Sequence, residues 1–122
     1  MSEARMPPAA DRRRTFLACL RAHQACEDAV AAALREGTGG DELVSTLLDC
    51  ADVCRTTARY VRTGSPLVRG TAGVCAELCE RAAEACAPLT EQDAIMGACV
   101  DACRRCAGWC RRLADHPLER AA

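Results

Sequence analysis

The sequence predicts an all-α fold, an antiparallel four-helix bundle whose core is lined with cysteine. Four segments of roughly twenty residues, rich in Ala, Leu, Arg and Glu, are separated by short runs that contain Gly or Pro. No run alternates apolar and polar residues with the period of a strand. All eleven cysteines lie inside these four segments. Helical segments of this length with short connections fold most simply as an antiparallel bundle.

The first two segments begin at capping residues and end at glycine. The first runs from Asp11 to about Glu36 and stops at the GTGG run, residues 37–40. Asp41 caps the second segment, which ends at Thr63–Gly64. Both segments therefore have a helix start signal and a helix stop signal.

The last two segments begin at other capping patterns. Ser65–Pro66 predicts the start of the third segment, because a capping hydroxyl is followed by proline at the first helical position, and Pro88 closes it. Thr90, followed three residues later by Asp93, resembles a capping box and opens the fourth segment. That segment continues to about Ala114.

These segments form one domain between two tails. We expect residues 11–116 to form the bundle, and residues 1–10 and 117–122 to be flexible tails. At 122 residues the chain is long enough to bury a core. The chain has only one Phe, one Tyr and one Trp, so smaller side chains must fill that core.

The cysteines repeat on one template in all four segments. Positions 99, 103, 106 and 110 fall within an arc of roughly 60°, at about 100° per helical residue. The same spacing, laid on the other three segments, accounts for every remaining cysteine and also includes His23. The opposite faces carry charged residues, so the cysteine stripe must point inward, beside apolar positions such as Leu20 and Leu47.

Several interpretations of the stripe do not involve a metal core. An odd number of cysteines, and an N-terminus without an apolar stretch, disfavour a disulfide scaffold. Cys103 and Cys106 have the spacing of a redox motif but lack its βαβ context, and a zinc ribbon needs such pairs on tight turns. Cysteine acting only as a small hydrophobe would leave the core underfilled.

A multinuclear metal core fits the stripe best. Cβ atoms three or four residues apart on a helix are about 5–6 Å apart, so two thiolates can reach one metal. Soft thiolates select Cu(I), zinc or iron–sulfur clusters, and iron–sulfur clusters need four cysteines that converge rather than spread along an axis. Monovalent Cu(I) in near one-to-one ratio neutralises buried thiolates, whereas four-thiolate zinc sites stay negative. We predict multiple Cu(I) ions per chain, with these ligands: Cys19, His23, Cys26, Cys50, Cys54, Cys75, Cys79, Cys86, Cys99, Cys103, Cys106 and Cys110.

From about Cys19 to Ala114 the chain resembles the cysteine-rich four-helix-bundle copper storage proteins. The resemblance rests on LLDCADVC, on GSP before the third segment, on CAELCERAAEAC and on CVDACRRCAGWCRRLA. It implies storage of many Cu(I) ions along the bundle core, assembly as a tetramer and, without an export signal, a cytosolic location. Ala72 and Ala82 stand where the family pattern often has cysteine, which implies a smaller capacity or a cluster confined to part of the axis.

Charge and composition disfavour other classes of function. With 16 basic and 17 acidic residues and no basic stripe, we expect no nucleic-acid partner. No apolar stretch suggests a signal peptide or membrane anchor, so we expect a cytoplasmic protein with no membrane partner. No nucleophile–base pair, phosphate loop or paired carboxylate site suggests an enzyme.

We therefore expect a copper storage or buffering protein that is a homo-oligomer and exchanges copper with a chaperone or an efflux system. An iron–sulfur or other thiolate-metal redox protein is the alternative, and a helical interaction module with incidental thiols is a third hypothesis. Met96 lies one turn before Cys99, where a thioether could pass Cu(I) inward or simply fill the core. His116 follows the fourth segment as a loop residue that could take part in metal transfer.

Overall fold

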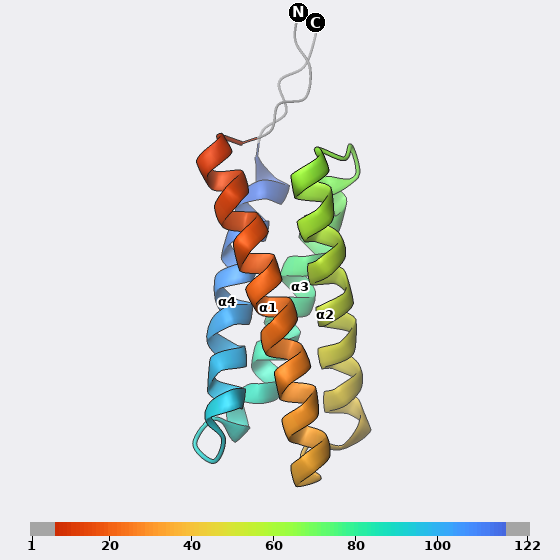
Figure 1. Cartoon of the computed structure of the whole chain (residues 1–122), viewed down its shortest axis with the longest axis vertical. Coiled ribbons are helices and arrows are strands. Elements are labelled where there is room, and N and C mark those ends of the chain that lie inside the picture. The colour runs from red at the N-terminus through yellow and green to blue at the C-terminus, as the bar shows by residue number, and fades with distance from the viewer. Residues whose placement is uncertain (1–6, 117–122) are drawn as a thin grey trace, which may run out of the picture.

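The computed structural model describes residues 7–116 as a four-helix bundle, so the predicted fold class is confirmed. Each helix packs against two neighbours, α1 and α3 both contacting α2 and α4, and successive helices run in opposite directions (Figure 1). We call the end where α1 begins the upper end and the opposite end the lower end, as in Figure 1. The elements are α1 (Ala9–Glu36), α2 (Gly40–Thr63), α3 (Val68–Cys86), the 3-10 turn η1 (Ala87–Leu89) and α4 (Ala94–Asp115).

The ends of α1 and α2 lie where the sequence predicts them. Gly37 and Gly64 follow these helices with φ angles of 69° and 70°, and their N–H groups donate to carbonyl oxygens one turn back. Glycine adopts this left-handed conformation without the clash that a Cβ would cause. α1 begins at Ala9 and α2 at Gly40, so neither Asp11 nor Asp41 caps its helix as the sequence predicts. Residues 1–6 and 117–122 of the predicted tails lie outside the described residues.

The starts of α3 and α4 differ from the prediction. α3 begins at Val68, because Ser65 Oγ accepts a hydrogen bond from the Leu67 N–H at 3.1 Å and holds residues 65–67 in a turn. α4 is capped by Asp93, whose carboxylate accepts from the Ile95 N–H at 2.8 Å. Thr90 does not cap the helix as predicted, since its hydroxyl donates to the carbonyl of the preceding η1 turn.

Small side chains fill the core, as the shortage of aromatic residues requires. Alanine and cysteine make up most of the buried residues, and Leu47 and Met96 are among the largest side chains that are fully buried. Trp109 lies at the edge of the bundle, with the guanidinium groups of Arg112 and Arg14 at 4.7 and 5.8 Å from its ring centroid. Within residues 7–116, no helix is long and apolar enough to cross a membrane.

Candidate metal centre

All eleven cysteines are fully buried, and all carry free thiols. Successive cysteines on a helix are mostly three or four residues apart, so that their side chains share one face and follow one another along the bundle axis. The four helices bring these faces together, and the sulfur atoms form a continuous column inside the bundle. The inward orientation of the stripe is therefore confirmed.

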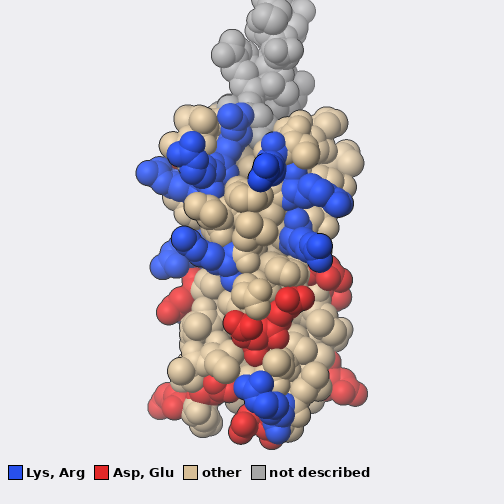
Figure 2. All heavy atoms as spheres, in the orientation of Figure 1, with Lys and Arg blue, Asp and Glu red and all other residues tan. Residues whose placement is uncertain are grey.

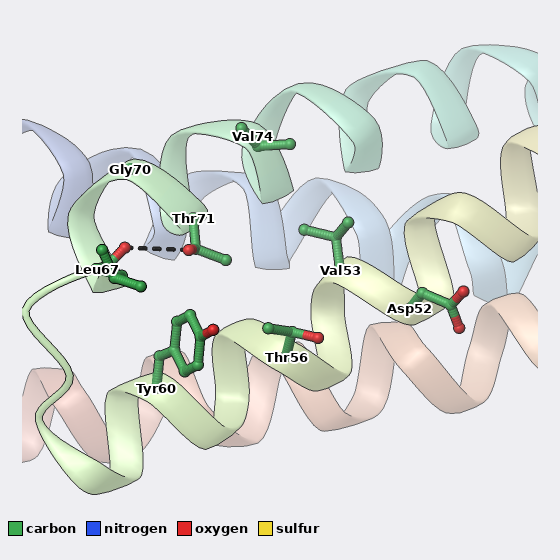
Figure 3. A pocket seen from close by; sticks show the side chains of 8 residues that line it. All are labelled: Asp52, Val53, Thr56, Tyr60, Leu67, Gly70, Thr71 and Val74. Atoms are coloured by element: carbon green, nitrogen blue, oxygen red, sulfur yellow. Dashed lines mark hydrogen bonds between the residues drawn. The ribbon is translucent and has the colours of Figure 1, made fainter.

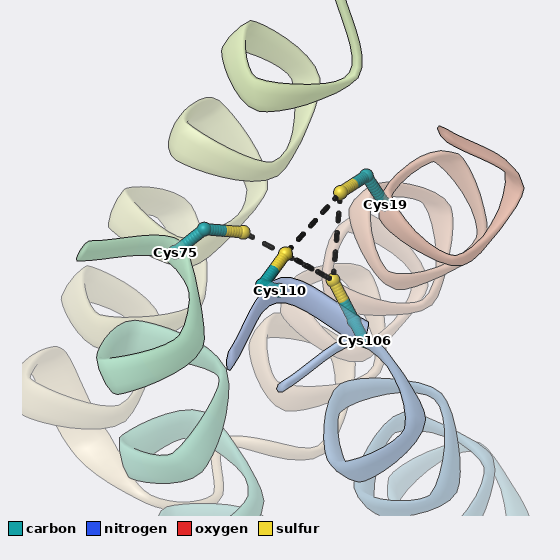
Figure 4. A group of neighbouring side chains, drawn as sticks. All are labelled: Cys19, Cys75, Cys106 and Cys110. Carbon is teal, nitrogen blue, oxygen red and sulfur yellow. Dashed lines mark hydrogen bonds between the residues drawn. The ribbon is translucent and has the colours of Figure 1, made fainter. Parts of the chain in front are cut away.

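The first compact group of thiols lies toward the upper end of the column (Figure 4). Its members are Cys19 from α1, Cys75 from α3, and Cys106 and Cys110 from α4. The sulfur of Cys19 lies 3.7 Å from those of Cys106 and Cys110, and the sulfur of Cys75 lies 3.9 Å from that of Cys106. All four sulfur atoms lie within 4.8 Å of one another, so they can bind one ion together.

A second four-thiol group shares Cys75 and Cys106 with the first and adds Cys54 and Cys79. The Cys54 sulfur lies 3.5 Å from that of Cys79 and 3.6 Å from that of Cys75. Two groups that share two sulfur atoms form a single six-thiol cluster, to which every helix contributes. We call it the upper cluster; its members are Cys19, Cys54, Cys75, Cys79, Cys106 and Cys110.

The column continues without a break below the upper cluster. Cys26, Cys50 and Cys103 form a third compact group, and the Cys50 sulfur lies 3.6 Å from that of Cys79 in the upper cluster. Cys99 follows, 3.9 Å from the sulfur atoms of Cys26 and Cys103. Cys86 comes next: hydrogen bonding with Cys99 is the first cause of its raised pKa, followed by burial.

The spacing of these sulfur atoms suits a metal ion held by three or four thiolates. With metal–sulfur bonds of about 2.3 Å, as in zinc thiolates, sulfur atoms 3.5–3.9 Å apart subtend about 100–116° at a shared metal. This range lies near tetrahedral and trigonal coordination and far from linear coordination. The column can therefore accept soft metal ions with little movement of the helices.

The surroundings of the column decide which charge the ions must carry. Among the described residues, Thr15 and Thr57 are the only buried polar side chains apart from the thiols, and each donates its hydroxyl hydrogen to a carbonyl one turn back. No buried cation is therefore present to balance excess thiolate charge. A column of thiolates in this environment is stable only when bound ions neutralise it.

Neighbouring thiols shift one another's acidity. Hydrogen bonds with other thiols, and then burial, raise the pKa of Cys19, Cys26 and Cys79 above the ordinary thiol value. The pKa of Cys103 is lowered to about 6, because neighbouring thiols, Cys26 first, hydrogen bond to its thiolate. The thiols whose pKa is raised keep their protons in the copper-free chain, and metal must displace those protons.

The remaining predicted site residues lie outside the compact thiol groups. His23 Nδ1 lies 2.9 Å from the Ala51 carbonyl oxygen, and its Nε2 lies 3.5 Å from a carboxylate oxygen of Glu27. Met96 is buried at the lower end of α4, where it lines a surface hollow. His116 lies beyond the upper end of α4, and its carbonyl oxygen accepts a hydrogen bond from Arg69.

Residues beside the stripe divide between core and surface. Leu47 is fully buried, as its place beside the stripe predicts, but Leu20 is 38% exposed, so its assignment to the core was wrong. Ala72 and Ala82 are buried where the family pattern often has cysteine, yet the sulfur atoms remain in contact past them. The sequence did not single out Cys75 and Cys106 as shared members, because their role depends on the axial register of α3 and α4.

Comparison with known proteins agrees with this geometry. Residues 9–115 match the Csp family, described as copper storage protein. A solved structure described as copper loading to a cytosolic copper storage protein from Streptomyces lividans, with five coppers, is 30% identical, with a TM-score of 0.81 over 90% of this chain and 99% of that one. The Streptomyces lividans protein Ccsp has also been solved loaded with 10 copper equivalents, at 31% identity and a TM-score of 0.80, over 86% of this chain and 84% of that one.

Two further relatives are more distant in sequence. The Cu(I)-bound copper storage protein BsCsp3 is 25% identical, with a TM-score of 0.78 over 85% of this chain and 98% of that one. The uncharacterized cysteine-rich protein YhjQ of Bacillus subtilis is 29% identical over 99 residues, which cover 80% of this chain and 90% of that protein. The family match spans nearly the whole bundle and contains every cysteine of the column, and this chain belongs to the copper storage protein family.

Proposed function

We propose that this chain stores copper in the cytoplasm, holding multiple Cu(I) ions along the axis of the bundle without catalytic turnover. The observation that carries the proposal is the unbroken column of eleven buried free thiols. Family membership supports it, as do the two relatives solved with several coppers or with Cu(I). The relative described as cytosolic supports the cytoplasmic location.

Charge balance favours Cu(I) over a divalent ion. Each Cu(I) that replaces a thiol proton leaves the buried column neutral, whereas zinc held by four thiolates leaves two negative charges. Since no buried cation among residues 7–116 could offset that excess, the capacity should be on the order of one ion per thiolate.

We propose all eleven cysteines as copper ligands, and His23 remains a predicted twelfth. His23 could reach the column only by giving up its hydrogen bond with the Ala51 carbonyl, which costs about 1 kcal/mol. Nine of the cysteines need no such rearrangement, because their sulfur atoms already form groups that one metal ion can bridge, and the Cys99 sulfur lies 3.9 Å from those of Cys26 and Cys103.

An anaerobic titration with Cu(I) in the presence of a competing chelator tests the proposal. We expect the chain to keep about ten ions against the chelator and to stay colourless, because Cu(I) has a filled d shell. Binding of only one or two ions would refute storage. A brown protein with visible absorption on anaerobic isolation would instead indicate an iron–sulfur cluster.

Storage also implies partners that deliver and remove copper. We propose that the chain assembles as a homo-oligomer, with a tetramer implied by the family resemblance, and that a copper chaperone or an efflux system exchanges copper with it. Copper release from the loaded chain to a purified chaperone, measured by metal analysis after the two proteins are separated, tests the exchange.

A further inference from the structure

Five arginines from α1 and α2 gather around one groove on the upper half of the bundle. Arg55, Arg59 and Arg62 follow one another on α2 at spacings of four and three residues, so their side chains share one face of that helix. Arg12 and Arg13 face them from α1, because both line a hollow of about 350 Å³ together with Arg62. Figure 2 shows arginine over the upper half of the side that α1 and α2 present.

The floor of this groove is apolar and contains an aromatic ring. A second hollow of about 360 Å³ adjoins the first and shares Phe16 and Arg62 with it, and Leu20 and Ala58 also line it. The Arg62 guanidinium lies over the Phe16 ring, 6.0 Å from the ring centroid. We call the two hollows together the arginine groove. Hollows of this size are typical of small-molecule sites.

The positive charge of the arginine groove is not neutralised within the bundle. Neither hollow has an acidic residue in its lining. Within residues 7–116, none of the five arginines forms an ion pair with a carboxylate. The face of α3 and α4 differs, since Arg81 pairs with Glu77 at 2.6 Å and Arg111 pairs with Glu80 at 2.7 Å. The guanidinium groups of the groove are therefore free to bind an anion from outside the bundle.

The groove on the other side of α2 has a different character. Figure 3 shows this second groove, of about 490 Å³, between α2 and α3. Val53, Tyr60, Leu67 and Val74 line its walls, and its lining contains Asp52 but no basic residue. Since α2 borders both grooves, its arginines are confined to the side that faces α1. An anionic ligand would therefore select the arginine groove.

Carboxylates limit the length of the ligand. Asp52 lies about one turn below Arg55 on α2, and Glu27 lies about two turns below Leu20 on α1, and both carboxylates are exposed. From the level of Arg12 to that of Leu20, the groove is about 12 Å long at about 1.5 Å per residue. A longer chain of phosphates would extend downward to these carboxylates and be repelled. The groove therefore suits a short anion rather than a nucleic acid.

We propose that the arginine groove binds a nucleoside polyphosphate, with the phosphates against the arginines and the base against the floor beside Phe16. Guanidinium groups are planar forks that donate two parallel hydrogen bonds to phosphate oxygens. Bases stack on aromatic rings and on guanidinium planes. One aromatic ring among five arginines thus matches a ligand with one planar base and several negative charges. This site goes beyond copper storage and does not depend on it.

Isothermal titration calorimetry of the copper-free, full-length chain with ATP at low ionic strength tests the proposal. We expect one ATP per chain. Adenosine, which lacks the phosphates, and inorganic triphosphate, which lacks the base, should each bind at least tenfold more weakly. Arg59→Ala with Arg62→Ala removes two guanidinium forks and should weaken ATP binding roughly a hundredfold. Phe16→Leu keeps the floor apolar and should weaken ATP binding about tenfold without changing the affinity for inorganic triphosphate.

The matched control is Arg104→Ala with Arg105→Ala on the exposed face of α4, a helix that does not border the groove. It makes the same charge change and should leave ATP affinity within about twofold of the native value. Denaturation midpoints show which variants are folded.

Four results would overturn the proposal: a native chain that does not bind ATP, inorganic triphosphate that binds as tightly as ATP, a single-stranded oligonucleotide that binds more tightly than ATP, or groove variants that lose no more affinity than the control. Copper capacity is measured separately by Cu(I) titration. Its loss in the native chain would refute storage without bearing on the arginine groove, because no thiol lines this groove.

Discussion

Replacing the two shared thiols, Cys75 and Cys106, should remove about twice as much tightly held copper as replacing two thiols at the lower end. Cys75 and Cys106 belong to both four-thiol groups of the upper cluster. With both changed to alanine, each group keeps only two thiols, Cys19 with Cys110 and Cys54 with Cys79. The matched control changes Cys86 and Cys99 to alanine, which leaves all three compact groups whole.

The size of the difference follows from the number of thiols each change disables. The control should lose about two ions, in line with one ion per removed thiolate. The change at Cys75 and Cys106 should lose about four against a chelator, because Cys19 and Cys110 would keep no third close thiolate, whereas Cys54 and Cys79 would still have the Cys50 sulfur within 3.9 Å. Without copper both variants should lose about 2 kcal/mol of unfolding free energy, at about 0.8 kcal/mol for each buried group the size of a methylene.

Copper per chain after gel filtration with excess bicinchoninate measures the effect, and denaturant unfolding of the copper-free variants confirms equal stability. Equal copper loss from the two variants would show that the shared thiols have no special role. That result would refute the assignment of the six sulfur atoms to one cluster.

Three other predictions concern acidity, His23 and Trp109. The unfolding free energy of the copper-free chain should rise between about pH 6 and pH 9.0, because folding lowers the pKa of Cys103 to about 6. Above pH 9.0 it should fall by about 1.4 kcal/mol per pH unit for each thiol that stays protonated, because folding raises the pKa of Cys19, Cys26 and Cys79. Denaturant unfolding at pH 7, pH 9 and pH 11 measures this, and a flat profile contradicts it. His23→Gln should bind one ion fewer in the titration, as expected of the predicted twelfth ligand, and lose about 1 kcal/mol of stability with the hydrogen bond to Ala51; an unchanged capacity would refute the assignment of His23 as a ligand. Trp109→Ala should lower the free energy of unfolding by about 2 kcal/mol, because packing and the contacts of the ring with Arg14 and Arg112 are lost, and copper capacity should stay unchanged. An unaltered denaturation midpoint would show that this contact between α1 and α4 does not stabilise the bundle.

The sequence was sufficient for the fold and for the identity of the cysteine column. Helical periodicity alone puts the cysteines on one face of each helix, since an α-helix repeats every 3.6 residues whatever surrounds it. Gly37 and Gly64 also mark helix ends reliably, because both adopt the left-handed conformation that favours glycine. These features depend on residues close together in the chain, so that local rules predict them.

Features that depend on contacts between helices could not be read from the sequence. The shared positions of Cys75 and Cys106 follow from the axial register of α3 and α4, which packing of the whole bundle sets. Leu20 lies beside the stripe on a helical wheel, yet the rotation of α1 leaves it 38% exposed. Asp93 rather than Thr90 caps α4, because the η1 turn already uses the Thr90 hydroxyl.

Neighbouring sulfur atoms of the copper-free chain already lie 3.5–3.9 Å apart, so the metal-binding site is formed before any ion binds. Many zinc-binding domains unfold when the metal leaves, because the metal supplies their folding energy. In this bundle, alanine and cysteine pack the interior without metal. A depleted chain should therefore resist proteolysis much as a full one does, and a cell can draw down its reserve and refill it without synthesising new protein.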